Sequence, residues 1–534
     1  MNKIISIIGI FVILGFSVSC YKDLSTSARG EYPEIDLNVS DDSESIYVGY
    51  GDYLKLESNA KQLGVPDEDL EYSWKIGYFI NSQYESLEEI SKEHSINIQI
   101  VNTPSNDPYY VSLTVTNKND GYNRSKCWKL YVSSTLGDGL LVAHTKDGGS
   151  TSILSLVTAK PLSFGYSSDD YRVVNDVYGL ANDGKAIKGR VHSLLSRMCT
   201  YIERPNPKSF SDYRVMVATD DTLRMLNPLQ YKAEEFNEAL FSGKMKFNNF
   251  KADTVFNLAT CASCALMDGY LYACAEVMGY QYTPVSVSIN PSDRIFTTRN
   301  TSAVPASQGY LAVFNPTDGC FYGAHGVFIT QSSVSVIDPP VSPSPSDMLG
   351  KIPVAAGVLD TNCNAFVVKD KSDKYYLVRL YLNNSVAASV IELSLPDVDN
   401  AKGWAFCDNA NVFYYYTSDA IYSTLVSGSA ATTRKLSFKP ENPSEKITML
   451  KQYTQAWWGA GQSNTDDPNG LYYYAFPLET NRLQMIIVTF DESSKEGKFY
   501  LKPFNVSTGM FSTFKDNGVY GGFGEITAVC STLK

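Results

Sequence analysis

The sequence predicts an all-β protein in which a small N-terminal β-sandwich is followed by a β-propeller. The composition favours strands, because 37 Tyr, 25 Phe and 5 Trp make 13% of the 534 residues aromatic, and aromatic side chains suit pleated, half-buried surfaces. Short alternating runs separated by turns fill residues 32–134. Beyond them a hairpin pattern recurs about every 50 residues, which is the spacing of propeller blades.

The N-terminus has the layout of a secretory signal. An apolar run from Ile4 to Val18 is followed by small residues before Cys20, and this run is short for a membrane span, which needs roughly 20 residues. The ending resembles a bacterial lipobox, with Ser17 at the position where Leu is usual. The resemblance implies cleavage after residue 19, so that residues 1–19 are a lipoprotein signal peptide and Cys20 carries the lipid.

Residues 20–31 are polar and lack periodicity, so we expect a flexible tether. The Lys22-Asp23 pair within it resembles the short charged signal that directs Bacteroidota-type lipoproteins to the outer face of the outer membrane. No other segment approaches 18 consecutive apolar residues. We therefore expect a protein held at the cell surface by lipid alone.

Residues 32–134 are expected to form an immunoglobulin-like sandwich, because six strand-like runs follow one another within about 100 residues. The strand around Trp74 and the alternating run from Tyr110 to Asn117 resemble the central and penultimate strands of the PKD domain. The resemblance implies that Trp74 is a core residue and that the domain is a spacer or contact module. The six runs are Glu34 to Val39, Ser45 to Leu56, Leu70 to Ile76, Ile96 to Val101, Tyr109 to Thr116 and Cys127 to Val132.

Residues 136–534 are expected to form the propeller, with seven blades. Between Asp220 and Asp419 the turns recur at intervals of 48, 50, 52 and 49 residues. A further hairpin is expected at Asn182-Asp183-Gly184, and the run from Glu525 to Cys530 could close the ring against the first blade, which would hide the sheet edges. The seven turns are Asp147-Gly148, Asp220-Asp221, Asp268-Gly269, Asp318-Gly319, Asp370 to Asp373, Ser418-Asp419 and Leu478 to Asn481.

The first of these turns carries a recognisable local motif. Residues Thr145 to Thr151 fit the S/T-x-D-x-G-x-T core of the Asp box, which is found at hairpin turns of sialidase-like propellers, although Ser152 stands where that motif ends in Trp. Asp boxes lie away from the active site. The motif therefore supports the fold and assigns no chemistry.

No linear motif predicts catalysis, a metal or a cofactor. The 4 His are isolated, and the metalloprotease, nucleophile-elbow and phosphate-loop patterns are missing. We interpret Glu234-Glu235 and Asp466-Asp467 as solvated charge, although carboxylate pairs assembled across blades leave no linear signature. The Cys261 to Cys264 pair lacks the second pair that a zinc site needs, so we interpret these thiols as buried.

Exposed aromatic residues are the better candidates for binding. Trp457 and Trp458 are adjacent and precede a glycine-containing stretch, so both rings could be reached by a ligand. Tyr414 to Tyr416 and Tyr472 to Tyr474 lie within strand runs and are expected to pack between blades. A net charge of -12 with no basic run argues against nucleic acid as a partner.

The signal, the single PKD-like domain and the Tyr-rich repeat together resemble the PKD-like family lipoproteins of Bacteroidota-type bacteria. The resemblance implies a non-catalytic accessory component of a nutrient uptake system, with a TonB-dependent transporter and its substrate-binding lipoprotein as partners and an oligosaccharide or peptide as ligand. Two alternatives remain open, a surface propeller enzyme (glycosidase, lyase or peptidase) and a structural or adhesive module. Three or more acids with a His or Arg in the central cleft would indicate the enzyme, whereas an aromatic lining would indicate binding.

Overall fold

The structure is a computed structural model, and its contacts divide the described chain into two compact units, the first within residues 33–130 and the second mainly residues 131–532. Among the described residues, no helix is both long and apolar enough to cross a bilayer. The structure describes residues 33–532 except 81–82, 103–107, 134–135, 137, 164–167, 204–207, 229, 245–246, 248–249, 251, 260–261, 268–269, 276–280, 287–294, 299–308, 327–333, 337–344, 361–362, 382–387, 456–480 and 513–517.

The first nine strands form one five-stranded sheet, in the order β2-β9-β8-β5-β6, and the two-stranded sheets β3-β7 and β1-β4. The pairs β9-β8, β8-β5 and β5-β6 are antiparallel. The strands are β1 (Ile35–Asp36), β2 (Ser45–Gly49), β3 (Tyr53–Glu57), β4 (Lys61–Gln62), β5 (Leu70–Ile80), β6 (Gln83–Ser91), β7 (Ser95–Gln99), β8 (Tyr109–Asn117) and β9 (Asn123–Ser133). The alternating burial of β8 places Val111, Leu113 and Val115 in the core, as its period of two requires.

Trp74 is fully buried, as the sequence indicated. Its ring stacks on Trp128 of β9 with centroids 5.9 Å apart and the planes inclined by 17°. The indole nitrogens donate to backbone carbonyls, Trp74 to Glu93 at 2.9 Å and Trp128 to Asp41 at 3.0 Å. Because both N–H groups are satisfied, neither indole leaves a polar group unpaired in the core.

The remaining strands form seven antiparallel sheets among the described residues. The first contains β38 (Glu525–Thr532), β10 (Gly139–Thr145), β11 (Thr151–Thr158) and β12 (Arg172–Val174), with β13 (Ile187–Lys188) also paired to β11. The second contains β14 (Val191–Glu203), β15 (Lys208–Thr219), β16 (Leu223–Leu226) and β17 (Ala233–Phe236), and the third β18 (Ala252–Ala259), β19 (Ala262–Met267), β20 (Tyr270–Ala275) and β21 (Thr283–Ser286). The fourth contains β22 (Ile295–Thr298), β23 (Gly309–Asn315), β24 (Cys320–Gly326) and β25 (Val334–Val336).

The last three sheets follow the same plan. They contain β26 (Ile352–Leu359), β27 (Cys363–Lys369), β28 (Tyr375–Leu380) and β29 (Ser389–Leu393); β30 (Gly403–Phe406), β31 (Val412–Tyr416), β32 (Ile421–Ser427) and β33 (Ala430–Lys435); and β34 (Lys446–Gln452), β35 (Gln484–Asp491), β36 (Glu496–Pro503) and β37 (Val519–Phe523). The helices are short, namely α2 (Val177–Ala181), α3 (Pro345–Met348) and the 3₁₀ turns η1 (Asp67–Asp69), η2 (Asn237–Leu240), η3 (Ser242–Lys244) and η6 (Val398–Asn400).

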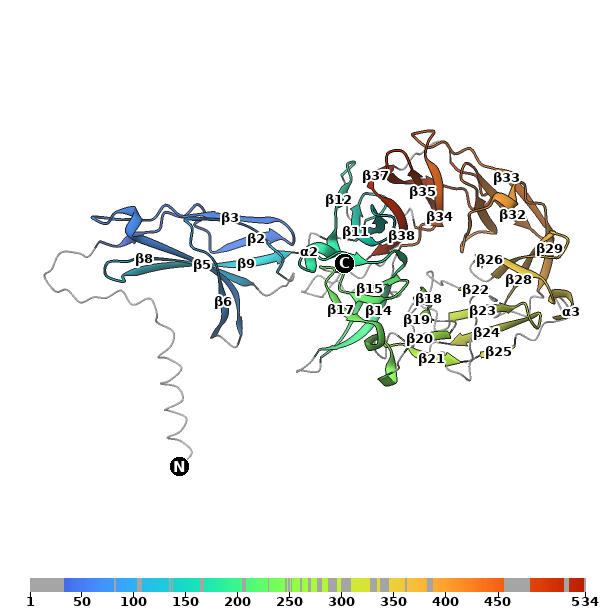
Figure 1. Cartoon of the computed structure of the whole chain (residues 1–534), viewed down its shortest axis with the longest axis horizontal. Coiled ribbons are helices and arrows are strands. Elements are labelled where there is room, and N and C mark those ends of the chain that lie inside the picture. The colour runs from blue at the N-terminus through green and yellow to red at the C-terminus, as the bar shows by residue number, and fades with distance from the viewer. Residues whose placement is uncertain are drawn as a thin grey trace, which may run out of the picture. The chain divides into compact units, whose positions relative to one another are not determined.

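The seven sheets follow one another around a ring, with β38, β14, β18, β22, β26 and β34 toward its middle and β12, β17, β21, β25, β29 and β33 at its rim (Figure 1). This arrangement is that of a β-propeller. The ring closes where the last strand joins the first sheet: β38 pairs antiparallel with β10 from Gly139 opposite Thr532 to Thr145 opposite Glu525. The predicted closure by the C-terminal run is thereby confirmed.

The predicted hairpins occupy one fixed position in the sheets. Six of them are the second and third strands of their sheets, β10-β11, β15-β16, β19-β20, β23-β24, β27-β28 and β31-β32. In the turns of Asp147, Asp318 and Asp370 the carboxylate accepts backbone amides, whereas the predicted turn Asp268-Gly269 lies outside the described residues. Asp370 Oδ1, for example, accepts from the amides of Ser372 and Lys374 at 2.8 and 3.1 Å.

Two of the predicted hairpins are not among these six. Asn182-Asp183-Gly184 is not a hairpin, because these residues follow helix α2 and the flanking strands β12 and β13 both pair with β11 instead of with each other. In the last sheet the second and third strands are β35 and β36. The run Tyr472 to Phe476, predicted to fill that position, lies outside the described residues.

Tyrosines inside the strands pack between sheets, as predicted for Tyr414 to Tyr416. Tyr414 and Tyr415 are fully buried and Tyr416 is 6% exposed. Their hydroxyls donate to carbonyl oxygens, Tyr414 to Gly509 at 3.0 Å and Tyr416 to Thr448 at 2.7 Å. Burial raises the pKa of Tyr416 to about 12. These phenols therefore stay neutral and join neighbouring segments.

Candidate functional site

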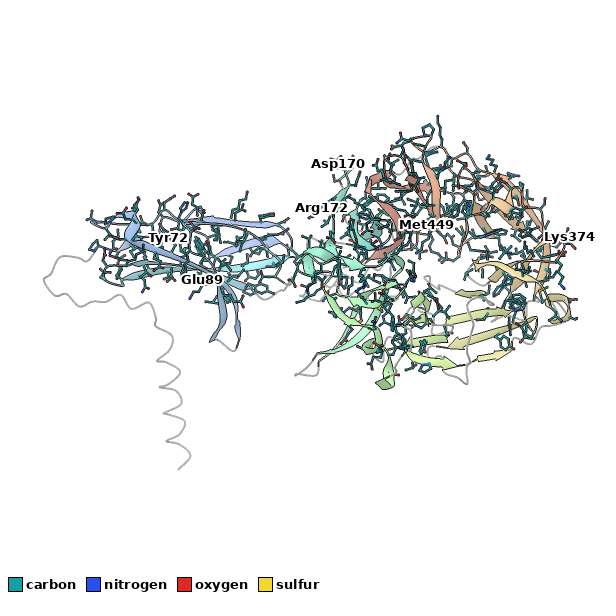
Figure 2. The ribbon with its side chains drawn as sticks, viewed as in Figure 1. Tyr72, Glu89, Asp170, Arg172, Lys374 and Met449 are labelled. Atoms are coloured by element: carbon teal, nitrogen blue, oxygen red, sulfur yellow. The ribbon has the colours of Figure 1, made fainter. Side chains whose placement is uncertain are left out.

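A cleft of about 380 Å³ lies among the inner strands of the propeller. Its walls come from β18, β26, β30 and β34, the first strand of each of their sheets, and from Asp408 and Thr454 just beyond two of them. Figure 2 labels Met449 of β34 on the inner side of the ring, whereas Lys374, in the turn between β27 and β28, lies at the rim. The cleft is within the range of about 300–1,000 Å³ that is usual for small-ligand sites.

Three aromatic side chains line the cleft. Phe256 comes from β18, and Trp404 and Phe406 come from alternate positions of β30, so they share one face of that strand. All three are half-buried. The strand behind supports them, because Trp404 packs on Tyr415 at 5.1 Å between centroids and Phe406 stacks on Phe413 at 5.5 Å. The rings are thus held rigidly with part of their surface facing the cleft.

A glycine opposite β30 sets the position of Phe406. Gly357 of β26 faces this ring so closely that a Cβ at residue 357 would lie 2.2 Å from Phe406 Cγ. Only glycine at residue 357 leaves room for the Phe406 ring. The shape of this wall therefore depends on one missing methyl group.

The polar side of the cleft is organised around Asp408. Arg482 donates from Nε to Asp408 Oδ1 at 2.7 Å and from a terminal nitrogen to the Asp408 carbonyl at 2.8 Å, and both side chains are 11% exposed. Gln452 accepts from the Asp408 amide at 3.0 Å and donates to Asn409 Oδ1 at 2.8 Å. Burial raises the pKa of Asp408, and Arg482 opposes that rise. The carboxylate is thus engaged with a cation of the protein.

Lys451 of β34 also lines the cleft, where its side chain is open to solvent. Its Nζ donates to the carbonyl oxygen of Val529 on β38 at 2.9 Å. The neighbouring Cys530 supplies no negative charge at neutral pH, since burial raises its thiol pKa to about 12.

The candidate residues named from sequence lie elsewhere or outside the described chain. Cys20, Trp457 and Trp458 are outside the described residues, as is Asp466-Asp467. In sequence, Trp457 follows the cleft residue Thr454 by three positions.

The interpretation of Glu234 as solvated charge is wrong. It lies on strand β17, where its carboxylate accepts from Arg214 Nε at 2.6 Å, and the two side chains are 22% and 7% exposed. The neighbouring Glu235 has its pKa raised by burial and by the charge of Glu234. Glu234 therefore takes part in a structural ion pair with Arg214.

The Asp-box turn has the hydrogen bonds that its sequence indicates. Asp147 accepts from the Thr151 amide at 3.0 Å, the Thr151 hydroxyl at 2.7 Å and the Thr145 hydroxyl at 2.8 Å. These bonds hold the pKa of Asp147 well below its usual range. The hydrogen bonds of this carboxylate therefore stabilise the turn between β10 and β11.

The described part of the chain contains no assembled metal site or reactive thiol site. No group of three or more His, Cys, Asp or Glu side chains there could hold a metal ion. Cys264 is buried, as expected, and Cys261 lies outside the described residues. His144 is buried at the ring closure, where it accepts from the Gly524 amide through Nδ1 at 3.1 Å and contacts the Ser155 hydroxyl through Nε2 at 3.0 Å.

Sequence reasoning missed Phe256, Trp404, Phe406 and Lys451. A usable signal existed, because in the second to sixth sheets the run that precedes the predicted hairpin supplies the inner strand. The alternation Trp404-Ala405-Phe406 just before the hairpin of β31 and β32 is one example.

The fold defines the class as a β-propeller protein, with a cleft among its inner strands. No protein-family model matches the sequence, and no curated protein matches it. Among solved structures, the chain is similar to a quinonprotein alcohol dehydrogenase-like protein from Bacteroides thetaiotaomicron (10% identity, 94% of this chain and 100% of that chain, TM-score 0.47). It is also similar to AztD from Citrobacter koseri (9%, 86% and 98%, TM-score 0.33) and to the fucose-specific lectin of Aleuria aurantia (8%, 62% and 96%, TM-score 0.32). These are likenesses of fold.

Proposed function

We propose that this protein is a non-catalytic binding component that captures its ligand in the cleft among the inner strands. The observation that carries the proposal is the lining: among the described residues it has three aromatic side chains, Phe256, Trp404 and Phe406, and a single carboxylate, Asp408, which is paired with Arg482. Rigid aromatic anchors are the usual source of affinity in a binding site. A hydrolase of the kind considered from sequence would need further acids there.

We propose further that the seven sheets are the blades of a seven-bladed propeller and that residues 32–134 are an immunoglobulin-like, PKD-like spacer. Cys20 would carry the lipid that holds the protein on the outer face of the outer membrane. The partners would be a TonB-dependent transporter and its substrate-binding lipoprotein, and the ligand an oligosaccharide or a peptide. The sequence features of the N-terminus and the resemblance to PKD-like lipoproteins support this placement.

Trp457 and Trp458 remain part of the proposal as ligand contacts. Their position in sequence, shortly after the cleft residue Thr454, supports a role at the same site. Replacing both by Ala should weaken ligand binding without unfolding the protein. Unchanged binding by the folded double variant would remove them from the site.

The test of the binding function starts from the intact outer-membrane complex. Affinity purification followed by identification of co-purifying proteins and bound ligand should recover a transporter and an oligosaccharide or peptide. Trp404→Ala and Phe256→Ala should weaken binding of the recovered ligand, whereas Tyr53→Ala, which removes a 58% exposed ring on strand β3 outside the cleft lining, should not. Melting temperatures of all variants report whether the fold is kept. Turnover of the ligand by the purified chain would refute the proposal.

A further inference from the structure

Lys451 gives the cleft an electrostatic preference. Lys451 lines the cleft, and its ammonium group donates to a neutral acceptor, the Val529 carbonyl oxygen, at 2.9 Å. Among the described residues no carboxylate lies within ion-pair distance of Lys451, and Asp408, the carboxylate of the lining, is held by Arg482 at 2.7 Å. The Lys451 side chain is exposed, and its ammonium group has three N–H donors, so donors remain for a ligand beside the bond to Val529. An anionic group of a ligand would accept from one of these donors.

The aromatic wall lies in the same cleft. Trp404 and Phe406 present half-buried ring surfaces supported by the strand behind. Thr254 and Thr454 also line the cavity. Flat rings suit the apolar face of a sugar, hydroxyls suit its edge, and a lysine suits a carboxylate.

We propose, on the basis of the binding function above, that the cleft takes the acidic residue of an anionic oligosaccharide, with a sugar carboxylate on Lys451 Nζ and the sugar ring against Trp404 and Phe406. A cleft of about 380 Å³ accommodates a short terminal segment and not a folded partner. The whole chain has a net charge of -12, so long-range attraction does not favour an anion and the preference must come from this local contact.

The probes are four uronate trisaccharides, built from galacturonate, glucuronate, mannuronate or guluronate, each with its methyl ester as a neutral form of the same shape. Calorimetric titration compares the wild-type chain with Lys451→Gln, which removes the charge and keeps an N–H donor, and Lys451→Arg, which keeps the charge. Lys446→Gln is the matched control, because Lys446 is on the same strand but is paired with Asp419 at 2.6 Å and does not line the cleft.

At least one uronate should bind the wild-type chain more tightly than its ester. Lys451→Gln should weaken that uronate by about tenfold or more and leave the ester within about twofold, while Lys451→Arg keeps most of the affinity and Lys446→Gln changes neither. Trp404→Ala should weaken both forms, since the ring contact does not depend on charge.

Equal affinity for uronates and esters, or an unchanged uronate affinity in Lys451→Gln, would overturn the inference. Binding of triglutamate but of no uronate would replace the sugar by an acidic peptide, and binding of neither would overturn the anionic ligand altogether. The broader binding function has a different failure, which is turnover of a bound probe. Neutral probes that bind in a Trp404-dependent way would leave that function intact while the acidic preference falls.

Discussion

Mild acid should loosen the junction between β10 and β38 through His144. The side chain is 2% exposed and lies where the last strand joins the first sheet. The Gly524 amide donates to Nδ1 at 3.1 Å, so the proton of the neutral ring is on Nε2, which faces the Ser155 hydroxyl at 3.0 Å. A second proton on Nδ1 would point at the Gly524 N–H, and this hydrogen bond would be lost.

The size of the effect follows from the pKa. Burial, with a smaller contribution from the charge of Lys146, lowers the pKa of His144 from 6.5 to about 4. The unfolded chain therefore binds the proton more readily between these two values. The stability that the neutral ring contributes is fully present above pH 6.5 and is lost as the pH falls toward 4, to a total of about 3 kcal/mol.

Hydrogen–deuterium exchange of the peptide containing β38, corrected for the intrinsic rate at each pH, reports opening of this junction directly. Urea unfolding at pH 7.5, 5.5 and 4.5 gives the accompanying change in stability. The control is His144→Asn, whose Oδ1 can still accept from Gly524 but does not titrate. It should cost about 1 kcal/mol for the weakened contact with Ser155 and remove much of the pH dependence between 6.5 and 4.

The reasoning would be refuted if His144→Asn kept the wild-type slope of stability against pH in this window. In that case carboxylates alone would account for the acid sensitivity. It would also be refuted if β38 exchanged no faster at pH 4.5 than at pH 7.5 in the wild-type chain.

Three further predictions can be checked with standard assays. Gly357→Ala should displace Phe406 and destabilise the fold by about 1–3 kcal/mol, and probe titration should show weaker binding where the melting temperature is still high. Asp408→Asn should lower the free energy of unfolding by about 3–5 kcal/mol, because it leaves the buried charge of Arg482 without a partner. Replacing both residues by apolar ones should lower it less, and an equal loss would contradict this account. Mass spectrometry of the membrane-bound protein should find lipid on Cys20, and Cys20→Ser should release the chain from the membrane; an unlipidated wild-type protein would refute the assignment.

The repeat was readable from sequence because its signal is local. Aspartates in the hairpin turns accept nearby amides, as Asp370 and Asp147 do, and this chemistry recurs at the same position of successive sheets. The spacing of such turns is preserved even where the strands between them vary. The closing strand was readable for a similar reason, since the run from Glu525 to Cys530 is a complete strand outside the predicted hairpins.

The cleft was not readable because its parts are distant in sequence and follow no common pattern. Phe256 and Lys451 are separated by almost 200 residues and meet through the closure of the ring. The number of residues between the inner strand and the next strand also varies. Strand β26 ends at residue 359 and β27 begins at 363, whereas β34 ends at 452 and β35 begins at 484. Strand β6 was missed because its Glu-rich sequence is atypical of strands, and it is tolerated there at the edge of a sheet.

The pairing of β38 with β10 also determines the order in which this chain can fold. The two strands are almost 400 residues apart, so this contact has a high sequence separation and forms late. Until the final residues are available, β10 presents an unpaired edge that can pair with another chain. A chain truncated before Glu525 keeps that edge permanently. Premature termination or C-terminal proteolysis that removes β38 should therefore produce aggregation, even though the strands of the other six sheets have been made.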